Sequence, residues 1–547
     1  MDRAAGAPPI DILLIHPPAV KPAEPPLGTA VLLSRLRGRG VRAEAVDANL
    51  EAYLHLLDGP RIEAAAGASP PTALHRAARN VSRSLAFLRS LPAAGSFRRY
   101  VSAVRHLDAG LSAYRGESGS ERLTLGDYAH GGLSEFSPAD LARVASGGES
   151  TLFSPYFRND LLPRIARMRP RAVAISVHYR HQVLPAFELA GMVRAALPGT
   201  RLYGGGGMFS SWKNALLRSG LRLPAFDGIG FGPGETVLSF LVAGGFADAG
   251  YHLEAGGEVE FHPDYGFAPL PDYLSPEPVL PVASSRGCYY RKCAFCPEGV
   301  APTHPYAESD PATFPDLLLD MARKYGVRRF HLTDNAIPVR VLRSVAERGE
   351  RLRGISWHGF ARFGRELLDP GFAASLAASG CSMLQLGLES GSQALLDRMG
   401  KGTRVEEASA ILRNLSRAGI DAYVYVMLGA PGETERDAER THSFLSEHAG
   451  EIGFLNLSIL NLPRDAAFAD RGGDGSTAGG EPRGEDDPLG LYRPIPESGG
   501  WGRAQARRFL RRRLLCDPAI RAIAARTPPW FTSNHAFFFR RGAAQAP

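Results

Sequence analysis

The chain has 547 residues, of which 44% are hydrophobic and 22% are charged. This composition is that of a globular protein with roughly three or four domains, and it excludes a disordered or fibrous chain. The net charge of +7 is too small over this length to indicate nucleic-acid binding. No apolar run reaches the ~18 residues of a membrane span, and the run at 12–15 is too short for a signal-peptide core. We therefore expect a cytoplasmic protein without a membrane span.

Residues 8–255 alternate short apolar strands with helical segments. This alternation predicts an α/β domain with a Rossmann-like, doubly wound parallel sheet. From about 51 to 165 the chain is arginine-rich and helical, which indicates a helical insertion into this domain. The strand patterns lie at 10–15, 41–47, 172–177 and 201–203, and the helical patterns lie at 29–38 and 183–197.

A proline-rich stretch at 256–279 is interpreted as a linker to a second series of strands and helices. The pattern predicts a partial (β/α) barrel over 280–462, with the active site at the carboxyl ends of its strands. Residues 463–547 are expected to form a flexible Gly- and Asp-rich loop and a C-terminal helical segment with an aromatic tail. The barrel strands are expected at 330–332, 355–360, 383–387, 423–427 and 454–459.

Three of the five cysteines lie within nine residues, at Cys288, Cys293 and Cys296. Clustered cysteines in a chain of this kind indicate metal or redox chemistry rather than disulfide bonds. Three thiolates are one fewer than a tetrahedral zinc site or a four-cysteine iron–sulfur cluster requires. A site with three ligands leaves one coordination position open, and we expect chemistry at that position.

Two other interpretations of the cysteine loop stay open. One is a structural zinc loop with Cys381 or His304 as the fourth ligand, and the other is three unrelated buried thiols. The isolated Cys381 and Cys516 are otherwise expected in the hydrophobic core, because free cysteine is among the most buried residue types.

The segment from 286 to 296 (RGCYYRKCAFC) resembles the cysteine loop of the radical S-adenosylmethionine (SAM) superfamily. In that family three cysteines follow the first barrel strand, with an aromatic residue directly before the third. The spacing here is four residues and then two, where the family usually has three and then two. The resemblance implies that Cys288, Cys293 and Cys296 are catalytic and bind three irons of a four-iron, four-sulfur (4Fe-4S) cluster, whose fourth iron chelates SAM.

Four further segments resemble the ends of later barrel strands, in the same order as in that family. They are HLTDN at 331–335, Trp357 with Arg362, LGLESGSQ at 386–393, and YVMLGAPG at 425–432 followed by Glu433 and Thr434. The similarity covers about 280–460 and implies a radical SAM partial (β/α)6 barrel. Carboxylates and amides at strand ends suit a cationic sulfonium that carries a ribose. The resemblance implies SAM contacts from Phe295, Asp334, Arg362, Gln385, Glu389 and Ser390.

The N-terminal half, which precedes this barrel in the chain, resembles the cobalamin-binding domain of the cobalamin-dependent branch of the radical SAM family. Glycines at the turns of the predicted sheet let the backbone approach a flat, bulky ligand at its carboxyl edge. None of the 15 histidines has Asp two positions earlier, so cobalamin is expected without a histidine lower ligand. A Rossmann-like domain without a ligand stays open. The resemblance implies cobalamin contacts from Pro26, Gly28, Ser176, Gly204, Gly205, Gly206, Gly232 and Glu235.

Other histidines and glycines carry weaker patterns. Gly228 and Gly230 are followed by Pro233 where a dinucleotide motif needs a third glycine, so that motif does not fit. His178 and His181 lie just beyond a predicted strand, and we expect them to cap or make polar contacts, or else to face the cobalamin. His535 in the aromatic tail carries no interpretable pattern.

The two resemblances together imply a cobalamin-dependent radical SAM enzyme. The implied activity is methyl transfer from methylcobalamin to an unactivated carbon, after a 5′-deoxyadenosyl radical has abstracted hydrogen from a small-molecule or peptide substrate. An external electron donor such as flavodoxin or ferredoxin is implied. Ring contraction, cyclisation or oxidation without methylation stays an alternative. A tRNA-modifying enzyme is less consistent, because no RNA-binding module is recognisable, and a zinc-stapled binding protein without enzymatic activity is the remaining alternative.

Overall fold

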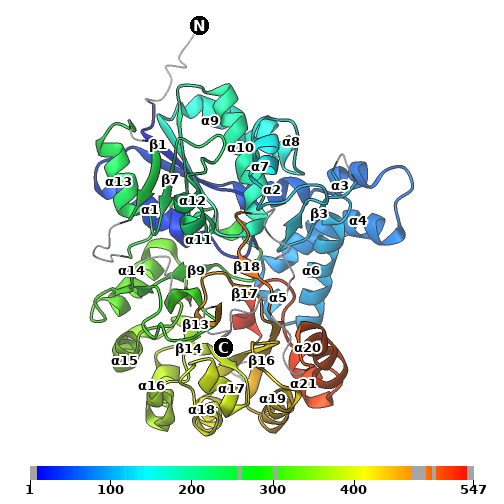
Figure 1. The fold of residues 1–547 in the computed structure, drawn as a ribbon, viewed down its shortest axis with the longest axis vertical. Helices are drawn as coiled ribbons and strands as arrows, with labels where there is room; N and C mark the ends of the chain where they lie inside the picture. The colour runs from blue at the N-terminus through cyan, green and yellow to red at the C-terminus, as the bar shows by residue number, and fades with distance from the viewer. Residues whose placement is uncertain are drawn as a thin grey trace.

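The protein is described here by a computed structural model, which defines residues 9–116, 119–247, 249–254, 261–299, 305–469, 488–495 and 500–538. Two α/β units lie one above the other in Figure 1, the N-terminal unit at the top and the later unit below it. Helices between α2 and α9 form a lateral block beside the upper unit, and the C-terminal helices flank the lower one. Within the described residues, no helix is both long and apolar enough to cross a membrane.

The upper unit is a six-stranded, fully parallel sheet in the order β2-β1-β5-β6-β7-β8. This arrangement confirms the predicted doubly wound sheet. The chain moves from β1 outward to β2 and later returns to the other side of β1 at β5, so a topological switch point lies between β1 and β5. The strands are β1 Ile12–His16, β2 Ala43–Asp47, β5 Ala172–Ser176, β6 Arg201–Gly205, β7 Gly228–Phe231 and β8 Gly250–Leu253, and the covering helices are α1 Leu27–Gly38, α10 Val183–Ala196, α11 Gly207–Ser211, α12 Lys213–Ser219 and α13 Glu235–Ala243.

The segment between β2 and β5 is helical, and it also contains a hairpin of two short strands, β3 and β4, that the sequence pattern did not predict. Its helices share one hydrophobic core with the α10 face of the sheet. The elements are α2 Ala48–Leu56, α3 Gly59–Ala66, α4 Thr72–Leu88, α5 Leu91–Ala94, α6 Phe97–Leu111, β3 Arg122–Leu123, β4 Tyr128–Ala129, α7 Pro138–Ala145, α8 Ser154–Tyr156, the π-helical turn η1 Phe157–Leu161 and α9 Leu162–Met168.

The lower unit is a six-stranded parallel sheet in the order β16-β15-β14-β13-β12-β9, curved into a partial barrel with helices outside. Alternate residues of β14 face opposite sides: Leu384, Leu386 and Leu388 pack against the helices, whereas Met383 lies in a separate inner cluster. The strands are β9 Val279–Val282, β12 Arg329–Leu332, β13 Ser356–Ala361, β14 Cys381–Glu389, β15 Asp421–Leu428 and β16 Ile452–Ile459, and the helices are α14 Phe314–Tyr325, α15 Val339–Glu347, α16 Pro370–Ala378, α17 Gln393–Arg398, α18 Val405–Ala418 and α19 Glu435–Glu447.

The C-terminal segment closes the gap between the two units. The described part of this segment includes α20 Arg503–Phe509, the π-helical turn η8 Leu510–Leu514, α21 Pro518–Ala524 and the buried turn η9 Ser533–Phe537. His535 is 2% exposed and stacks on Tyr423 of β15, with 4.5 Å between the ring centroids. Asn534 Nδ2 donates to Tyr100 Oη at 2.8 Å and to the Leu274 carbonyl oxygen at 2.9 Å. The tail therefore joins the insertion, the linker and the barrel.

One core prediction was wrong. Cys381 is buried on β14 as expected, but Cys516 is exposed. The neighbouring Leu514 takes the buried position at the end of the helix, so Cys516 lies in the turn outside the core. Residues 470–487 of the predicted Gly- and Asp-rich loop lie outside the described residues.

Candidate active site

The cysteine loop starts after β9 and the short strand β10 (Ser285–Arg286), at the carboxyl edge of the barrel sheet. All three of its cysteines are partly exposed rather than enclosed in the core. Burial raises the pKa of the Cys296 thiol to about 11, and the neighbouring Glu298, Cys293 and Cys288 add to the rise. The three thiols are thus close enough for Cys288 and Cys293 to affect the pKa of Cys296 electrostatically.

Among the described residues, no three Cys, His, Asp or Glu side chains converge closely enough to hold one metal ion. A 4Fe-4S cluster needs its three cysteines farther apart, because each sulfur binds a different iron. Cys381 begins β14 and therefore lies at the opposite edge of the parallel sheet from the loop. His304, the other proposed fourth zinc ligand, lies outside the described residues.

Arg362, which follows β13, lies directly against the cysteine loop. Its guanidinium carbon is 3.5 Å from the centroid of the Tyr290 ring, and its Nη1 is 3.9 Å from Cys293 Sγ. Its Nη2 donates to the Lys401 carbonyl oxygen. The structure therefore places this predicted site residue against the cysteine loop.

Glu389 and Phe295 meet at Lys401, which was not predicted as a site residue. Lys401 Nζ donates to Glu389 Oε1 at 2.7 Å and lies 5.8 Å from the centroid of the Phe295 ring. Glu389 ends β14 with φ +69°, a left-handed conformation that non-glycine residues adopt at a cost of about 1–2 kcal/mol. Strain of this kind is concentrated at functional sites.

The other three residues predicted to contact SAM are engaged by the protein itself. Asp334 accepts hydrogen bonds from Ser284 N at 3.1 Å, Ser284 Oγ at 2.8 Å and Ser285 Oγ at 2.5 Å, and burial raises its pKa. It thus anchors the segment that leads into Cys288. Ser390 is fully buried, with Oγ 3.0 Å from Thr441 Oγ1. Gln385 Nε2 donates to Tyr425 Oη at 3.0 Å inside the barrel, while its Oε1 is buried without a partner.

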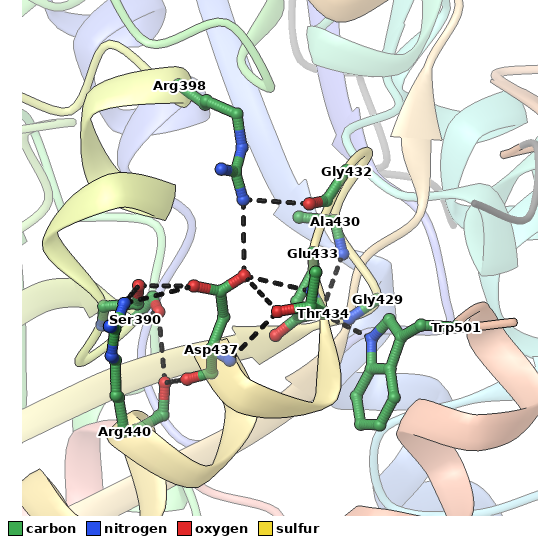
Figure 2. A network of polar contacts seen from close by, with 12 residues as sticks. Ser390, Arg398, Gly429, Ala430, Gly432, Glu433, Thr434, Asp437, Arg440 and Trp501 are labelled. Atoms are coloured by element: carbon green, nitrogen blue, oxygen red, sulfur yellow. Dashed lines mark hydrogen bonds and ion pairs between the residues drawn. The ribbon is translucent and has the colours of Figure 1, made fainter. Parts of the chain in front are cut away.

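Figure 2 shows the polar network after β15, where the predicted fifth-strand motif turns into α19. Glu433 Oε2 accepts hydrogen bonds from the Gly429 and Ala430 amides and from Trp501 Nε1 at 3.3 Å, whereas Oε1 is buried without a partner. Burial raises the pKa of Glu433 to about 7, despite these donors. Burial would also raise the pKa of Asp437, but hydrogen bonds from side chains that include Thr434 lower it below its usual value.

We expect this loop to make stability depend on pH. Because the pKa of Glu433 rises from 4.5 to about 7 on folding, its contribution is fully present below pH 4.5 and is lost as pH rises through 7, a loss of about 3 kcal/mol. Glu433→Gln mimics the protonated acid, with its carbonyl oxygen at the accepting position. Its Tm should match that of the wild type at pH 4.5 and exceed it at pH 8.

Glu433→Ala is the control, because it removes the acceptor at every pH. Its Tm should lie below that of the wild type at pH 4.5 and at pH 8. Equal pH dependence of Tm in Glu433→Gln and the wild type would contradict the assignment.

A cavity of about 640 Å³ lies between the carboxyl edge of the N-terminal sheet and the barrel. It spans the switch point, because residues after β1 and after β5 both line it. Its apolar part is formed by β1, β5 and α13, through Leu14, Ala174, Val237, Leu238 and Leu241. All eight residues predicted to contact cobalamin line this cavity: Pro26, Gly28, Ser176, Gly204, Gly205, Gly206, Gly232 and Glu235.

Gly205 opens the cavity by lacking a side chain. A Cβ atom built there would meet only the Gly230 carbonyl oxygen, at 3.7 Å. At Gly204, by contrast, a Cβ atom would clash with Ile229 at 2.8 Å and with Phe209 at 3.0 Å. The two adjacent glycines of β6 therefore have different roles. Gly205 leaves room in the cavity, whereas Gly204 leaves room for Ile229 and Phe209 to pack against the sheet.

The barrel contributes the opposite wall of the cavity. Arg286, two residues before Cys288, forms an ion pair with Glu235 of α13, so the cysteine loop and the cavity share a contact. Glu235 Oε2 is buried without a hydrogen-bond partner. Burial lowers the pKa of Arg286 to about 10. Sequence reasoning named Glu235 but missed Arg286, because nothing local indicates that an arginine beside a cysteine motif reaches another domain.

Glu24 and Lys21, two charged residues on the polar part of the cavity, were also missed by the sequence analysis. His331 Nδ1 lies 3.0 Å from Glu24 Oε1, and its ring stacks on His358 with 4.6 Å between centroids. Burial alone would lower the pKa of His331, but the Glu24 carboxylate raises it above its usual value. Lys21 from the same loop as Glu24 also lines the cavity. His331 belongs to the quoted second-strand motif, whereas Glu24 and Lys21 carried no pattern.

The two histidines beyond β5 both line this cavity, and whether they face a bound cobalamin stays a prediction. His178 projects into it, with Nε2 3.0 Å from Ser176 Oγ. His181 lies on the short turn η2 Arg180–Gln182, and its Nδ1 is 2.6 Å from Asp127 of the insertion. His181 therefore makes a polar contact that holds the insertion against the cavity rim.

Comparison with known proteins relates the barrel and its cysteine loop to a known family. Residues 282–445 match the family model of the radical SAM superfamily. The bacteriochlorophyllide d C-12(1)-methyltransferase of Chlorobaculum tepidum is 28% identical over 206 residues, which cover 36% of this chain and 43% of that protein. An uncharacterized methyltransferase of Pyrococcus horikoshii is 23% identical over 187 residues, which cover 33% of this chain and 40% of that protein.

Among solved structures, the radical SAM methyltransferase TsrM from Kitasatospora setae, with tryptophan substrate and a SAM analog bound, superposes with a TM-score of 0.51. The two chains are 16% identical, over 84% of this chain and 74% of that one. This likeness shows a common fold.

The barrel that carries the cysteine loop matches the radical SAM family model, and an α/β domain precedes it in the chain. The match over residues 282–445 agrees with the resemblance drawn from the cysteine loop. The matched segments span less than half the length of the curated relatives.

Proposed function

We propose that this protein is a cobalamin-dependent radical SAM methyltransferase that methylates an unactivated carbon. One observation carries the proposal: a single cavity is lined both by the residues predicted to contact cobalamin and by residues 285–287, which lead directly into Cys288. The two cofactor regions thus share a wall. A substrate in the cavity would lie within reach of both, which is what a methyl transfer coupled to SAM cleavage requires.

The residues present fit the two cofactors. Three thiols in a partly exposed loop are the donor set of a cluster with one open iron. The glycine cradle at Gly205 and the apolar lining from β1, β5 and α13 suit a large, flat ligand. When bound, the cluster with SAM supplies hydrogen abstraction and cobalamin supplies the methyl group.

The protein positions these groups and excludes water. Arg362 holds a positive charge beside Cys293, and Lys401 balances Glu389 at the end of β14. Asp334 anchors the segment before the cysteine loop through Ser284 and Ser285. Phe531, Thr532 and Ser533 of the C-terminal segment cover the cavity from the side of the insertion. Exclusion of water protects reactive intermediates from side reactions.

Mass spectrometry of SAM products tests the proposal. Protein reconstituted anaerobically with iron and sulfide, and supplied with reductant and hydroxocobalamin, should form 5′-deoxyadenosine, and also S-adenosylhomocysteine as the reduced cobalamin takes a methyl group from SAM. An external one-electron donor such as flavodoxin or ferredoxin should replace the chemical reductant. 5′-Deoxyadenosine without S-adenosylhomocysteine would favour ring contraction, cyclisation or oxidation over methyl transfer. A protein that holds zinc without iron or sulfide and forms neither product would contradict the enzyme assignment.

A further inference from the structure

Lys21 presents its ammonium group to the polar part of the cavity. It lies on the loop between β1 and α1, and two distant segments hold its side chain. A Cβ atom built on Gly126 would lie 3.3 Å from both Cγ and Cε of Lys21 and 3.2 Å from the Trp530 ring. Lys21 Nζ donates to Thr532 Oγ1 at 3.3 Å. The insertion and the C-terminal segment therefore both position this lysine.

The ammonium group has a neutral partner rather than a carboxylate. Within the described part of the chain, no carboxylate oxygen lies within 4.0 Å of Lys21 Nζ. Glu24, three residues further along the loop, is engaged by His331 Nδ1 at 3.0 and 3.1 Å. Burial lowers the pKa of Lys21, and Glu24 offsets only part of that effect. The side chain of Lys21 is nevertheless exposed where it lines the cavity, so its ammonium group is accessible to an anionic group of a ligand bound there.

The segment that supports Lys21 is held under strain. Trp530, which lies beside the lysine stem, has φ +66°, a left-handed conformation that costs a non-glycine residue about 1–2 kcal/mol. Two residues later Thr532 meets the ammonium group, and four residues later Asn534 is fully buried and bonded to Tyr100 and Leu274. Such strain persists only where the surrounding structure imposes it, and it is typical of ligand sites.

We propose that Lys21 binds an oxyanion of the ligand in this cavity. The oxyanion is either the phosphodiester in the nucleotide tail of cobalamin or a carboxylate or phosphate of the substrate. Both sources offer the same chemistry, an anionic oxygen that pairs with an ammonium and accepts from the Thr532 hydroxyl. The identity of the ligand rests on the proposed function, whereas the anion preference rests on the cavity alone.

Titration with two corrinoids separates the two sources. Hydroxocobalamin carries the phosphodiester, and cobinamide lacks the nucleotide tail. If the tail is the source, Lys21→Met should bind hydroxocobalamin about tenfold or more weakly than the wild type, because it loses a hydrogen bond between charged groups, and should bind cobinamide equally well. Lys324→Met is the matched control, since Lys324 is exposed and pairs with Asp264 on the barrel surface. An equal loss for both corrinoids would indicate a structural role and overturn the proposal.

Acetylation of the unmodified protein gives a second readout that does not depend on how the variant folds. The chain has only five lysines, Lys21, Lys213, Lys292, Lys324 and Lys401, so peptide mass mapping resolves each one. Hydroxocobalamin should slow acetylation of Lys21 and leave Lys324 unchanged, whereas cobinamide should do neither if the tail phosphodiester is the partner. If the substrate is the source, inorganic phosphate or acetate should slow acetylation of Lys21 in the cobinamide-loaded protein.

The proposal is overturned if Lys21→Met binds both corrinoids like the wild type and neither hydroxocobalamin nor the simple anions slow acetylation of Lys21. Formation of 5′-deoxyadenosine by the wild type is measured separately. A failed anion site and a failed enzyme assignment therefore give different results.

Discussion

Replacement of Cys288, Cys293 or Cys296 by alanine should reduce 5′-deoxyadenosine formation to the uncatalysed background. Each thiolate is expected to bind a different iron, so the loss of one leaves a second iron without a protein ligand. The three variants should also retain less iron and sulfide after anaerobic reconstitution. Iron and sulfide assays, together with mass spectrometry of the SAM products, measure both effects.

Cys516→Ala provides the matched control. Cys516 is exposed in the turn before α21, outside the cysteine loop. The variant should keep both the iron–sulfur content and the product yield of the wild type. Full SAM cleavage by all three loop variants would contradict the cluster assignment.

Gly205→Val should weaken the binding of hydroxocobalamin by tenfold or more. A Cβ atom at this position meets only a carbonyl oxygen at 3.7 Å, so the valine methyl groups would occupy the cavity rather than collide with the sheet. Valine is also favourable in a strand, so β6 should keep its structure. Absorbance titration of the protein with hydroxocobalamin measures the dissociation constant.

Gly199→Val tests whether any valine at a glycine position has this effect. Nothing lies within 4 Å of a Cβ atom built on Gly199, which precedes β6 outside the cavity. This variant should bind hydroxocobalamin like the wild type. Unchanged binding by Gly205→Val would show that the corrin does not occupy this cavity.

The sequence predicted the two parallel sheets because strongly apolar strands alternate with helices of regular spacing. The predicted strand at 172–177 became β5, and the predicted barrel strands became β12 to β16 with shifts of one or two residues. Strands β7, β8 and β9 were missed. They are four residues long, and glycine or proline interrupts each pattern or borders it closely. Their place in the sheets is decided by neighbouring strands rather than by their own composition.

The cysteine loop and the glycines were identified because each carries its chemistry in a short stretch of chain. The structure brings Arg362 and Glu389 to the cysteine loop, since strand ends in a parallel barrel meet at one edge, and their contact with SAM stays a prediction. Asp334 was correctly placed at the same edge, but it bonds to the serines before the loop. Local sequence shows which residues reach the carboxyl edge of the barrel sheet. It does not show which of them form hydrogen bonds within the protein and which remain available to a ligand.

The sequence by itself determined the alternation that builds two parallel sheets, and its cysteine motif carried the resemblance that implies an iron–sulfur cluster. Only the tertiary structure decided what surrounds the cavity. Lys21 meets Thr532 across 511 residues, and His331 meets Glu24 across 307 residues. Contacts between such distant segments depend on how whole domains pack, because no local periodicity specifies which loops face each other once the sheets have formed.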